Sequence, residues 1–336
     1  MTTPRPTNTS GGPPGGRGPA WEQPGARPVS DARVINGVVV DDTFAEAFPM
    51  KATRLIVTAH NLTWAHHAAA SATGFATSVI ACGCEAGIER ELSADETPDG
   101  RPGLAILIFS MSGKELAKQV ERRVGQCVLT CPTTAVFAGI SEGEAIALGK
   151  NLRFFGDGWQ MSKVIAGIRY WRVPVMDGEF VAQETTAVTK AVGGGNLLML
   201  ATGTDAALHA AEAAVQAMKR LRNVVMPFPG GVVRSGSKVG SKYATLSAST
   251  NDAFCPGLYG LAAKSELTPE VRCVLEIVID GLTEADVGAA MRVGMQACIG
   301  IGAAGGMLRV SAGNYGGKLG PYHFHLHKLL DAGDAA

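Results

Sequence analysis

A carboxyl group inside an apolar run is the most informative chemical feature of this sequence. Along residues 271–280 the side chains alternate between the two faces of a predicted strand, and Glu276 shares its face with Val274 and Val278. Aliphatic neighbours desolvate a carboxyl, raise its pKa and favour the protonated form near neutral pH. Such a group can donate a hydrogen bond to a developing oxyanion or pass a proton between amines. The alternative, a Glu paired with Lys or Arg on a solvated face, fits the same pattern.

Three irregular segments, 230–242, 247–257 and 311–321, are rich in glycine, hydroxyl, amide and cationic side chains. Backbone N–H groups and cations in the first and third suit an anionic ligand tail, and the second could hydrogen-bond a heterocycle edge. Surface loops with Asx and Ser turns are the alternative. The candidate binding residues are Arg234, Ser237, Lys238, Lys242, Ser249, Thr250, Asn251, Asp252, Asn314 and Lys318.

Several common catalytic motifs are absent from the sequence. There is no GxxxxGK[ST] loop, no GxGxxG between a strand and a helix, no GxSxG and no HExxH. A chain without these motifs offers no evident covalent nucleophile or nucleotide loop. If the protein is an enzyme, we expect it to position two substrates and adjust one or two protons.

Cysteine and histidine spacing gives little support for a metal site. The seven cysteines are odd in number and irregularly spaced, which predicts reduced thiols, and the pairs Cys82/Cys84 and Cys127/Cys131 do not have the CxxC spacing of zinc knuckles. Residues 322–329 predict a strand with three alternating histidines on one face. We interpret that face as half-exposed and predict no metal; a three-imidazole metal site is the alternative.

Hydrophobic periodicity places the same order of elements twice along the chain. The first half predicts strands at 54–59, 77–87, 104–110 and 128–134 and helices at 62–73 and 112–127; the second half predicts strands at 196–203, 223–233, 271–282 and 307–313 and helices at 204–221 and 283–300. Two split β-α-β units are the ferredoxin-like layout. The predicted fold class is therefore α+β, with two lobes of duplicated ferredoxin-like architecture.

Boundaries follow from composition and turn signals. Residues 1–32 are rich in Pro and Gly and predict a disordered tail. The two lobes are predicted at 33–175 and 176–330, separated near a hairpin that turns at Asp177-Gly178. Thr204 or Asp205 is expected to cap one helix, and a capping box of Thr283 and Asp286 to open another.

Composition excludes several classes of protein. The 336 residues are 46% apolar and 18% charged, which is enough apolar surface for a core. Thirty basic and thirty acidic residues give zero formal net charge, so no global field attracts nucleic acid or an anionic membrane. No apolar run reaches the roughly 18 residues of a spanning helix, and no signal pattern opens the chain, so we expect a cytoplasmic protein.

Nine sequence blocks resemble the formylmethanofuran:tetrahydromethanopterin formyltransferase family, in the family's order and over nearly all of residues 34–330. They include INGVVVDDTFAEAFPMKATRLIVTA (35–59), ATGFATSVIACGCEAGIE (72–89), PFPGGVVRSGSKVGSK (227–242), CVLEIVIDGL (273–282) and SAGNYGGKLGPYHFHLH (311–327). The remaining blocks are ETPDGRPG (96–103), RVGQCVLTCPT (123–133), RFFGDGWQ (153–160) and ASTNDAFCP (248–256).

The resemblance implies formyl transfer between a pterin carrier, tetrahydromethanopterin, and the primary amine of methanofuran or a bacterial analogue. It also implies no prosthetic group or metal, a homotetramer with active sites in clefts at subunit contacts, and Glu276 as the catalytic carboxyl. The composition is closer to bacterial members, which implies hydrolase subunits as partners and transfer from the pterin to the furan carrier. A non-catalytic scaffold subunit and a metal-dependent hydrolase are the alternative functions.

Overall fold

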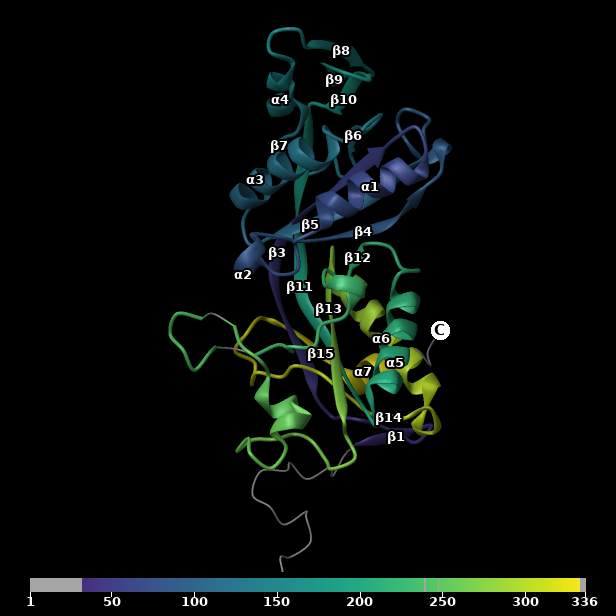
Figure 1. Cartoon of the computed structure of the whole chain (residues 1–336), viewed down its shortest axis with the longest axis vertical. Coiled ribbons are helices and arrows are strands. Elements are labelled where there is room, and N and C mark those ends of the chain that lie inside the picture. The colour runs from purple at the N-terminus through teal and green to yellow at the C-terminus, as the bar shows by residue number, and fades with distance from the viewer. Residues whose placement is uncertain (1–31, 239, 247, 333–336) are drawn as a thin grey trace, which may run out of the picture.

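The computed structural model describes residues 32–332 except 239 and 247, so the predicted tail, 1–32, lies outside the described residues apart from Ala32. The helices are α1 (Leu62–Thr73), α2 (Val79–Cys82), α3 (Gly113–Arg123), α4 (Gly149–Leu152), α5 (Thr204–Met218), α6 (Glu284–Ile301) and α7 (Leu326–Asp331). The strands are β1 (Arg33–Ile35), β2 (Val38–Val40), β3 (Phe44–Thr58), β4 (Glu85–Leu92), β5 (Gly103–Ser110), β6 (Ala135–Ala138), β7 (Glu144–Ala147), β8 (Met161–Ile165), β9 (Ile168–Val175), β10 (Gly178–Gln183), β11 (Thr185–Ala201), β12 (Val224–Val225), β13 (Cys273–Gly281), β14 (Met307–Ser311) and β15 (Tyr322–His325). Two lobes are stacked along the long axis of the molecule (Figure 1).

The upper lobe in Figure 1 contains the first β-α-β-β-α-β unit. Strand β3 pairs antiparallel with β5 and β6, and β5 pairs antiparallel with β4, so the sheet order is β4-β5-β3-β6. Helices α1 and α3 supply apolar side chains such as Ala68, Leu116 and Val120 to the core that they form with this sheet. This is the strand order of a ferredoxin-like unit.

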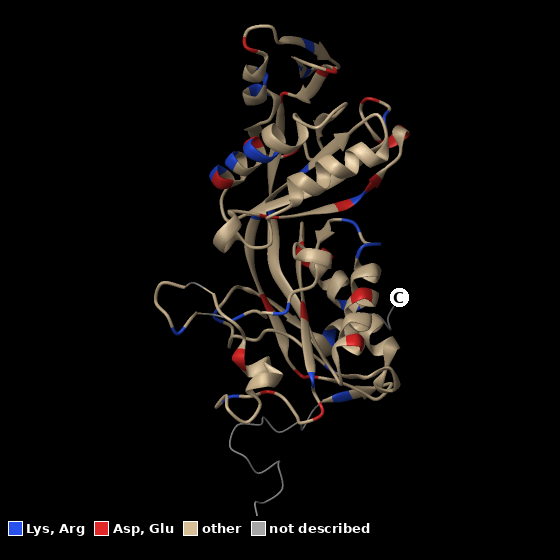
Figure 2. Cartoon of the chain, in the orientation of Figure 1, with Lys and Arg blue, Asp and Glu red and all other residues tan. Residues whose placement is uncertain are grey.

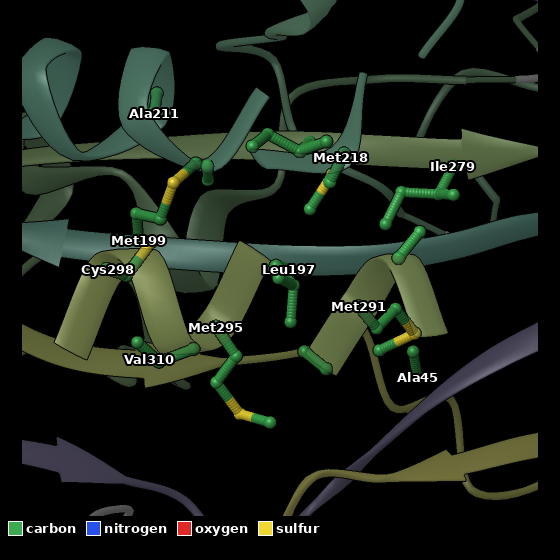
Figure 3. Close-up of a cluster of buried hydrophobic side chains, with 14 of the residues drawn as sticks. Ala45, Leu197, Met199, Ala211, Met218, Ile279, Met291, Met295, Cys298 and Val310 are labelled. Atoms are coloured by element: carbon green, nitrogen blue, oxygen red, sulfur yellow. The ribbon is translucent and has the colours of Figure 1, made fainter. Parts of the chain in front are cut away.

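The lower lobe repeats the arrangement with β11, α5, β12, β13, α6 and β14. Strand β11 pairs antiparallel with β13 and β14, and β12 pairs with β13, which gives the order β12-β13-β11-β14. Figure 3 shows the core of this lobe, in which Met291, Met295 and Cys298 of α6 share one buried cluster with Leu197 and Met199 of β11. The predicted duplication of a ferredoxin-like unit is therefore confirmed.

Strands β3 and β11 are long enough to belong to both lobes. Their middle sections pair with each other from Thr189↔Ala52 to Gly193↔Phe48. Ala45 and Ala47 at the start of β3 lie in the lower core, whereas Leu55 and Val57 near its end lie in the upper core. The predicted lobe boundary between residues 175 and 176 stays a prediction. Each of the two hydrophobic cores contains residues from both sides of that position.

Several predicted elements differ from the structure. Residues 77–87 are the short helix α2 followed by the first residues of β4, because Ser78 accepts a hydrogen bond from the backbone N–H of Ile80 and caps a helical turn. The strand predicted at 128–134 begins only at Ala135, after a π-helical turn. The strand predicted at 223–233 is reduced to β12, since prolines follow it.

Two further predictions concern single residues. The N-cap of α5 is Gly203 rather than Thr204 or Asp205, so that prediction was wrong. The predicted strand 322–329 ends at His325, and His327 lies in α7 with its ring against the carbonyl of Val40, so the histidines do not share one strand face. The predicted hairpin between β9 and β10 is confirmed, but its two-residue turn is Met176-Asp177, one residue before the predicted Asp177-Gly178.

Acidic and basic residues of both lobes are interspersed along the chain (Figure 2), as expected for zero net charge. Among residues 32–332 without 239 and 247, none of the helices has the length and apolar character to span a bilayer.

Thr283 caps α6, and its replacement by Ala should lower the free energy of unfolding by about 1 kcal/mol. The Thr283 hydroxyl accepts from the backbone N–H of Asp286 at 3.1 Å and donates to the Asp286 carboxylate at 2.6 Å, so the predicted N-cap is confirmed. Calorimetric melting temperatures of Thr283→Ala and of the exposed loop variant Thr245→Ala measure the effect. Equal melting temperatures would show that this cap contributes nothing.

Candidate active site

A cavity of about 700 Å³ lies where the two lobes meet. Segment 77–80 and Glu85 line it from the upper lobe, and Glu276 and Val278 of β13 line it from the lower lobe. Much of the remaining wall is apolar. The other lining residues are Phe48, Met111, Gly194, Asn196, Phe228, Val233, Ser235, Gly236, Ser237, Lys238, Ala248, Ser249, Thr250, Tyr315 and Leu319.

Glu276 occupies the centre of β13 and is 1% exposed. Its Oε1 atom accepts hydrogen bonds from Asn196 Nδ2 at 2.6 Å and from Ser237 Oγ at 2.5 Å. Its Oε2 atom is buried and has no hydrogen-bond partner among the described residues. Two hydrogen bonds therefore hold Oε1 in place, and Oε2 remains available to another group.

Burial raises the pKa of Glu276, and the hydrogen bonds from Ser237 and Asn196 oppose that rise only in part. A raised pKa favours the neutral acid, which has a proton to give at the unpartnered oxygen. The alternative of a solvated or ion-paired Glu276 is excluded by its burial and by its neutral partners. The carboxyl can act as a hydrogen-bond donor or a proton relay inside the cavity.

The loop 230–242 approaches Glu276 because its backbone pairs with β13 there. Val233 and Glu276 form an antiparallel bridge, with N–H···O distances of 2.8 and 2.9 Å. Asn251 Nδ2 then donates to the carbonyl of Ser237 at 2.7 Å, which ties segment 247–257 to the same loop. These contacts bring two of the three predicted binding segments to the cavity wall.

The predicted binding residues divide into three groups. Ser237, Lys238, Ser249 and Thr250 line the cavity with Glu276. Asn251 and Asp252 do not line the cavity but contact residues that do. Asn251 donates to the Ser237 carbonyl as above, and the Asp252 carboxylate pairs with Lys238 Nζ at 2.8 Å. The remaining four predicted residues also do not line the cavity within this one chain: Arg234, Lys242, Asn314 and Lys318.

The third segment, 311–321, reaches the cavity through residues that the sequence did not single out. Glu46 of β3 is buried and accepts hydrogen bonds from the backbone N–H groups of Tyr315, Gly317 and Leu319. Burial raises the pKa of Glu46, but these donors outweigh it and the net direction is down. An ionised Glu46 thus anchors the loop so that Tyr315 and Leu319 line the cavity.

A second pair of carboxyl groups lies between the lobes, at the part of the cavity lined by Glu85. Glu85 begins β4 and is 6% exposed, whereas Asp280 of β13 is fully buried. Burial raises the pKa of both, and for Asp280 the neighbouring Glu85 carboxylate raises it further. Asp280 Oδ1 accepts from the backbone N–H of Gly194 at 3.2 Å, and Glu85 Oε1 accepts from that of Val79 at 3.1 Å.

Asn196, Glu85 and Asp280 belong to the site although the sequence patterns did not single them out. Asn196 is a polar residue at the start of a continuous apolar run, and that contrast was an available signal. Asp280 lies on the same predicted face of β13 as Glu276, which was also visible. Glu85 gave no signal, because only tertiary packing brings β4 to β13.

Within the described ranges 32–238, 240–246 and 248–332, no three His, Cys, Asp or Glu side chains are arranged to hold a metal ion. All seven cysteines are free thiols. The polar groups that meet in the cavity are therefore carboxyl, amide, hydroxyl and ammonium groups.

A duplicated ferredoxin-like chain with a buried, hydrogen-bonded carboxyl of raised pKa in its inter-lobe cavity has the features of an acid–base enzyme that works on positioned substrates. The model of the formylmethanofuran-tetrahydromethanopterin formyltransferase family matches residues 34–175, and the model of that family's proximal lobe matches residues 178–329. The chain therefore belongs to the formylmethanofuran-tetrahydromethanopterin formyltransferase family.

Individual relatives agree with this assignment. A formylmethanofuran–tetrahydromethanopterin formyltransferase of Methylococcus capsulatus is 69% identical over 297 residues, which cover 88% of this chain and 99% of the relative. One of the subunits of the formyltransferase/hydrolase complex of Methylorubrum extorquens is 53% identical over 303 residues, which cover 88% of this chain and 97% of the relative.

Two solved structures have the same fold. The formyltransferase/hydrolase complex of Methylorubrum extorquens with methylofuran matches with a TM-score of 0.87 and 52% identity, over 89% of this chain and 99% of the matched chain. The formyltransferase of Methanosarcina barkeri matches with a TM-score of 0.84 and 47% identity, over 89% of this chain and all of the other.

Proposed function

We propose that this protein transfers a formyl group between tetrahydromethanopterin and the amine of methanofuran or a bacterial analogue, from the pterin to the furan carrier. Family membership supports the activity, and the observation that carries the chemistry is the buried Glu276 carboxyl with one unpartnered oxygen in the inter-lobe cavity. An absorbance assay of formyl exchange between the two purified carriers tests it. No exchange in either direction would overturn it.

The reaction needs one proton to leave the attacking amine and one to reach the departing nitrogen. The furan carrier's amine attacks the formyl carbon, and a C–N bond forms to give a tetrahedral intermediate. Neutral Glu276 donates its proton to the pterin nitrogen as that C–N bond breaks. The resulting carboxylate takes the proton from the new ammonium and returns to its neutral form, so Glu276 acts as donor and then acceptor.

Lys238 and Lys242 are proposed to hold the acidic tail of a carrier. Lys238 lines the cavity, and Lys242 lies exposed on the same loop. Replacing both by Ala should raise KM for a carboxylate-bearing carrier about tenfold at low salt, with a smaller effect at high salt because ions screen exposed charges. Steady-state kinetics at two ionic strengths measure this, and a salt-insensitive KM equal to that of the unmodified protein would contradict it.

We further propose that the chain assembles as a homotetramer and binds hydrolase subunits. The solved complex from Methylorubrum extorquens contains such a relative, which supports the second assembly. Exposed large apolar side chains gather on segment 154–168, and such patches mark interaction surfaces. They are Phe154, Phe155, Trp159, Met161, Val164, Ile165 and Ile168. Native mass measurement of the purified protein, alone and with hydrolase subunits, tests both assemblies.

The two other functions have weaker support. A non-catalytic scaffold would place no demand on Glu276, yet that carboxyl is buried with one unpartnered oxygen in the cavity, a costly arrangement that a catalytic role accounts for. A metal-dependent hydrolase would need a ligand cluster, and the described residues supply none. Elemental analysis of the purified protein distinguishes the hydrolase directly.

A further inference from the structure

The Glu85–Asp280 pair is an acidic feature of the cavity that formyl transfer at Glu276 does not use. Glu276, Val278 and Asp280 alternate along one face of β13, and the first two line the cavity. Asp280 lies four residue steps beyond Glu276 along the strand, a separation of about 13 Å. The cavity therefore has a carboxyl group at each of two separated positions, with an aliphatic wall between them.

Protonation distinguishes the two members of the pair. Burial raises the pKa of both carboxyls, but that of the fully buried Asp280 is raised further, so the proton of the pair favours Asp280 and leaves Glu85 as the ionised member. The Asp280 Oδ2 atom makes no hydrogen bond to the described residues, so it is left to donate to Glu85. Glu85 lines the cavity and accepts from the backbone of Val79. Each oxygen of an ionised carboxylate has two lone pairs, so Glu85 keeps acceptor capacity toward the cavity.

The surroundings of Glu85 suit a flat ring with N–H donors. The Phe48 ring lines the cavity close to Gly194, where an added Cβ would lie 2.8 Å from Phe48 Cε1. Gly194 in turn donates its N–H to Asp280. An aromatic face beside an ionised carboxylate can stack a heterocycle and accept hydrogen bonds from its edge.

We propose that Glu85 binds the 2-amino-4-oxo pyrimidine edge of the pterin carrier and that Asp280 positions Glu85 by donating a hydrogen bond to it. That edge presents two adjacent N–H donors, which match the two oxygens of one carboxylate. A bicyclic ring with a hydrogen bond of about 3 Å at each end spans a distance comparable with the separation from Glu276, so the reacting nitrogen lies near that carboxyl. The inference rests on the proposed use of a pterin carrier.

Equilibrium binding of tetrahydromethanopterin to Glu85→Gln tests this assignment. We expect Kd to rise about 10- to 100-fold, the usual loss for a hydrogen bond to a charged group. The matched control is Glu89→Gln, because Glu89 is also 6% exposed, lies on the same strand, and contacts the other lobe through the backbone N–H of Asn223 at 2.7 Å. Glu89 does not line the cavity, so its variant should keep Kd within about threefold.

A pterin analogue without the 2-amino group separates recognition from general damage to the lobe junction. Wild-type protein should bind this analogue about 10- to 100-fold more weakly than the parent pterin, and Glu85→Gln should bind both about equally. An equal loss on the analogue in both proteins would overturn the proposal, as would matching Kd values for the Glu85 and Glu89 variants. If Glu85→Gln does not fold, Glu85→Asp provides the same comparison with the charge retained.

The same measurements distinguish this inference from the proposed function. Failure of wild-type protein to bind the parent pterin would overturn the use of a pterin carrier itself. Tight binding by wild-type protein with an unaffected Glu85 variant would overturn only the role of Glu85. The Glu276→Gln variant should retain pterin binding better than Glu85→Gln. The opposite order would show that Glu85 is not the carboxyl that binds the pyrimidine edge.

Discussion

Glu276→Gln should lower kcat about 10²- to 10³-fold, because Gln cannot release the proton that the departing nitrogen needs. The amide can still accept from Asn196 and Ser237 with its oxygen, so the geometry around residue 276 should remain. Rapid-mixing kinetics with saturating carriers measure the effect. Turnover equal to that of the wild-type protein would remove Glu276 from the chemistry.

The pH dependence of kcat provides a second readout of the same carboxyl. Because the pKa of Glu276 is raised by burial, the neutral acid persists above the usual titration range of Glu, and kcat should fall as pH rises through the raised pKa. The Gln variant should lack this descending limb. If kcat of the variant still fell over the same pH range, the descending limb would belong to the titration of another group.

The Glu276→Gln variant should lose activity without losing stability at neutral pH. A carboxyl with a raised native-state pKa binds its proton more tightly in the folded state, so stability declines as pH rises from the unfolded-state pKa to the folded-state pKa. Gln has no such titration. At neutral pH, Glu276→Gln should therefore melt at or above the wild-type temperature, which shows that lost turnover is not lost folding.

Asn196→Ala is the second replacement with a large expected effect, because it acts on two parts of the site together. Asn196 is buried, donates to Glu276 Oε1, and accepts from the backbone N–H of Gly313 at 2.8 Å. Its loss leaves two buried polar groups without this partner, and we expect a destabilisation of about 2–4 kcal/mol and a kcat lowered about 10- to 100-fold. Thermal unfolding and steady-state kinetics measure the two effects.

Ser237→Ala is the matched control for that replacement. Ser237 also donates to Glu276 Oε1, but it is only partly buried and makes no hydrogen bond to segment 311–313. We expect it to shift the pH profile of kcat while leaving the melting temperature nearly unchanged. Equal melting temperatures for the Asn196 and Ser237 variants would contradict the structural role assigned to Asn196.

Local patterns predicted the duplicated architecture and placed Glu276 on one strand face with two valines, because both depend on short-range periodicity. Alternation along β13 is enough to place Glu276 between two valines, and the helix and strand order is enough to identify two ferredoxin-like units. The error at 77–87 has a local cause as well: an apolar run of that length fits either a strand or a capped helical turn followed by a strand.

The remaining parts of the site depend on contacts between distant segments. Glu85 and Asp280 are nearly 200 positions apart, and only the packing of β4 near β13 makes them a pair. Composition also did not show which polar side chains face inward: Arg234, Lys242 and Lys318 are exposed outside the cavity, whereas Asn196 and Tyr315 line it. Loop composition indicates what a segment can bind but not which side chains face inward.

The continuity of β3 and β11 through both lobes limits how the molecule can move. Hinge closure needs a flexible connection, whereas these strands cross the junction as hydrogen-bonded ribbons. The space between the lobes is thus shaped before any carrier binds. Discrimination among carriers must therefore depend on the fit of each carrier to a preformed cavity and not on closure of the lobes around it. A single backbone cut in the β9–β10 turn should accordingly leave both fragments tightly associated and still able to turn over substrate.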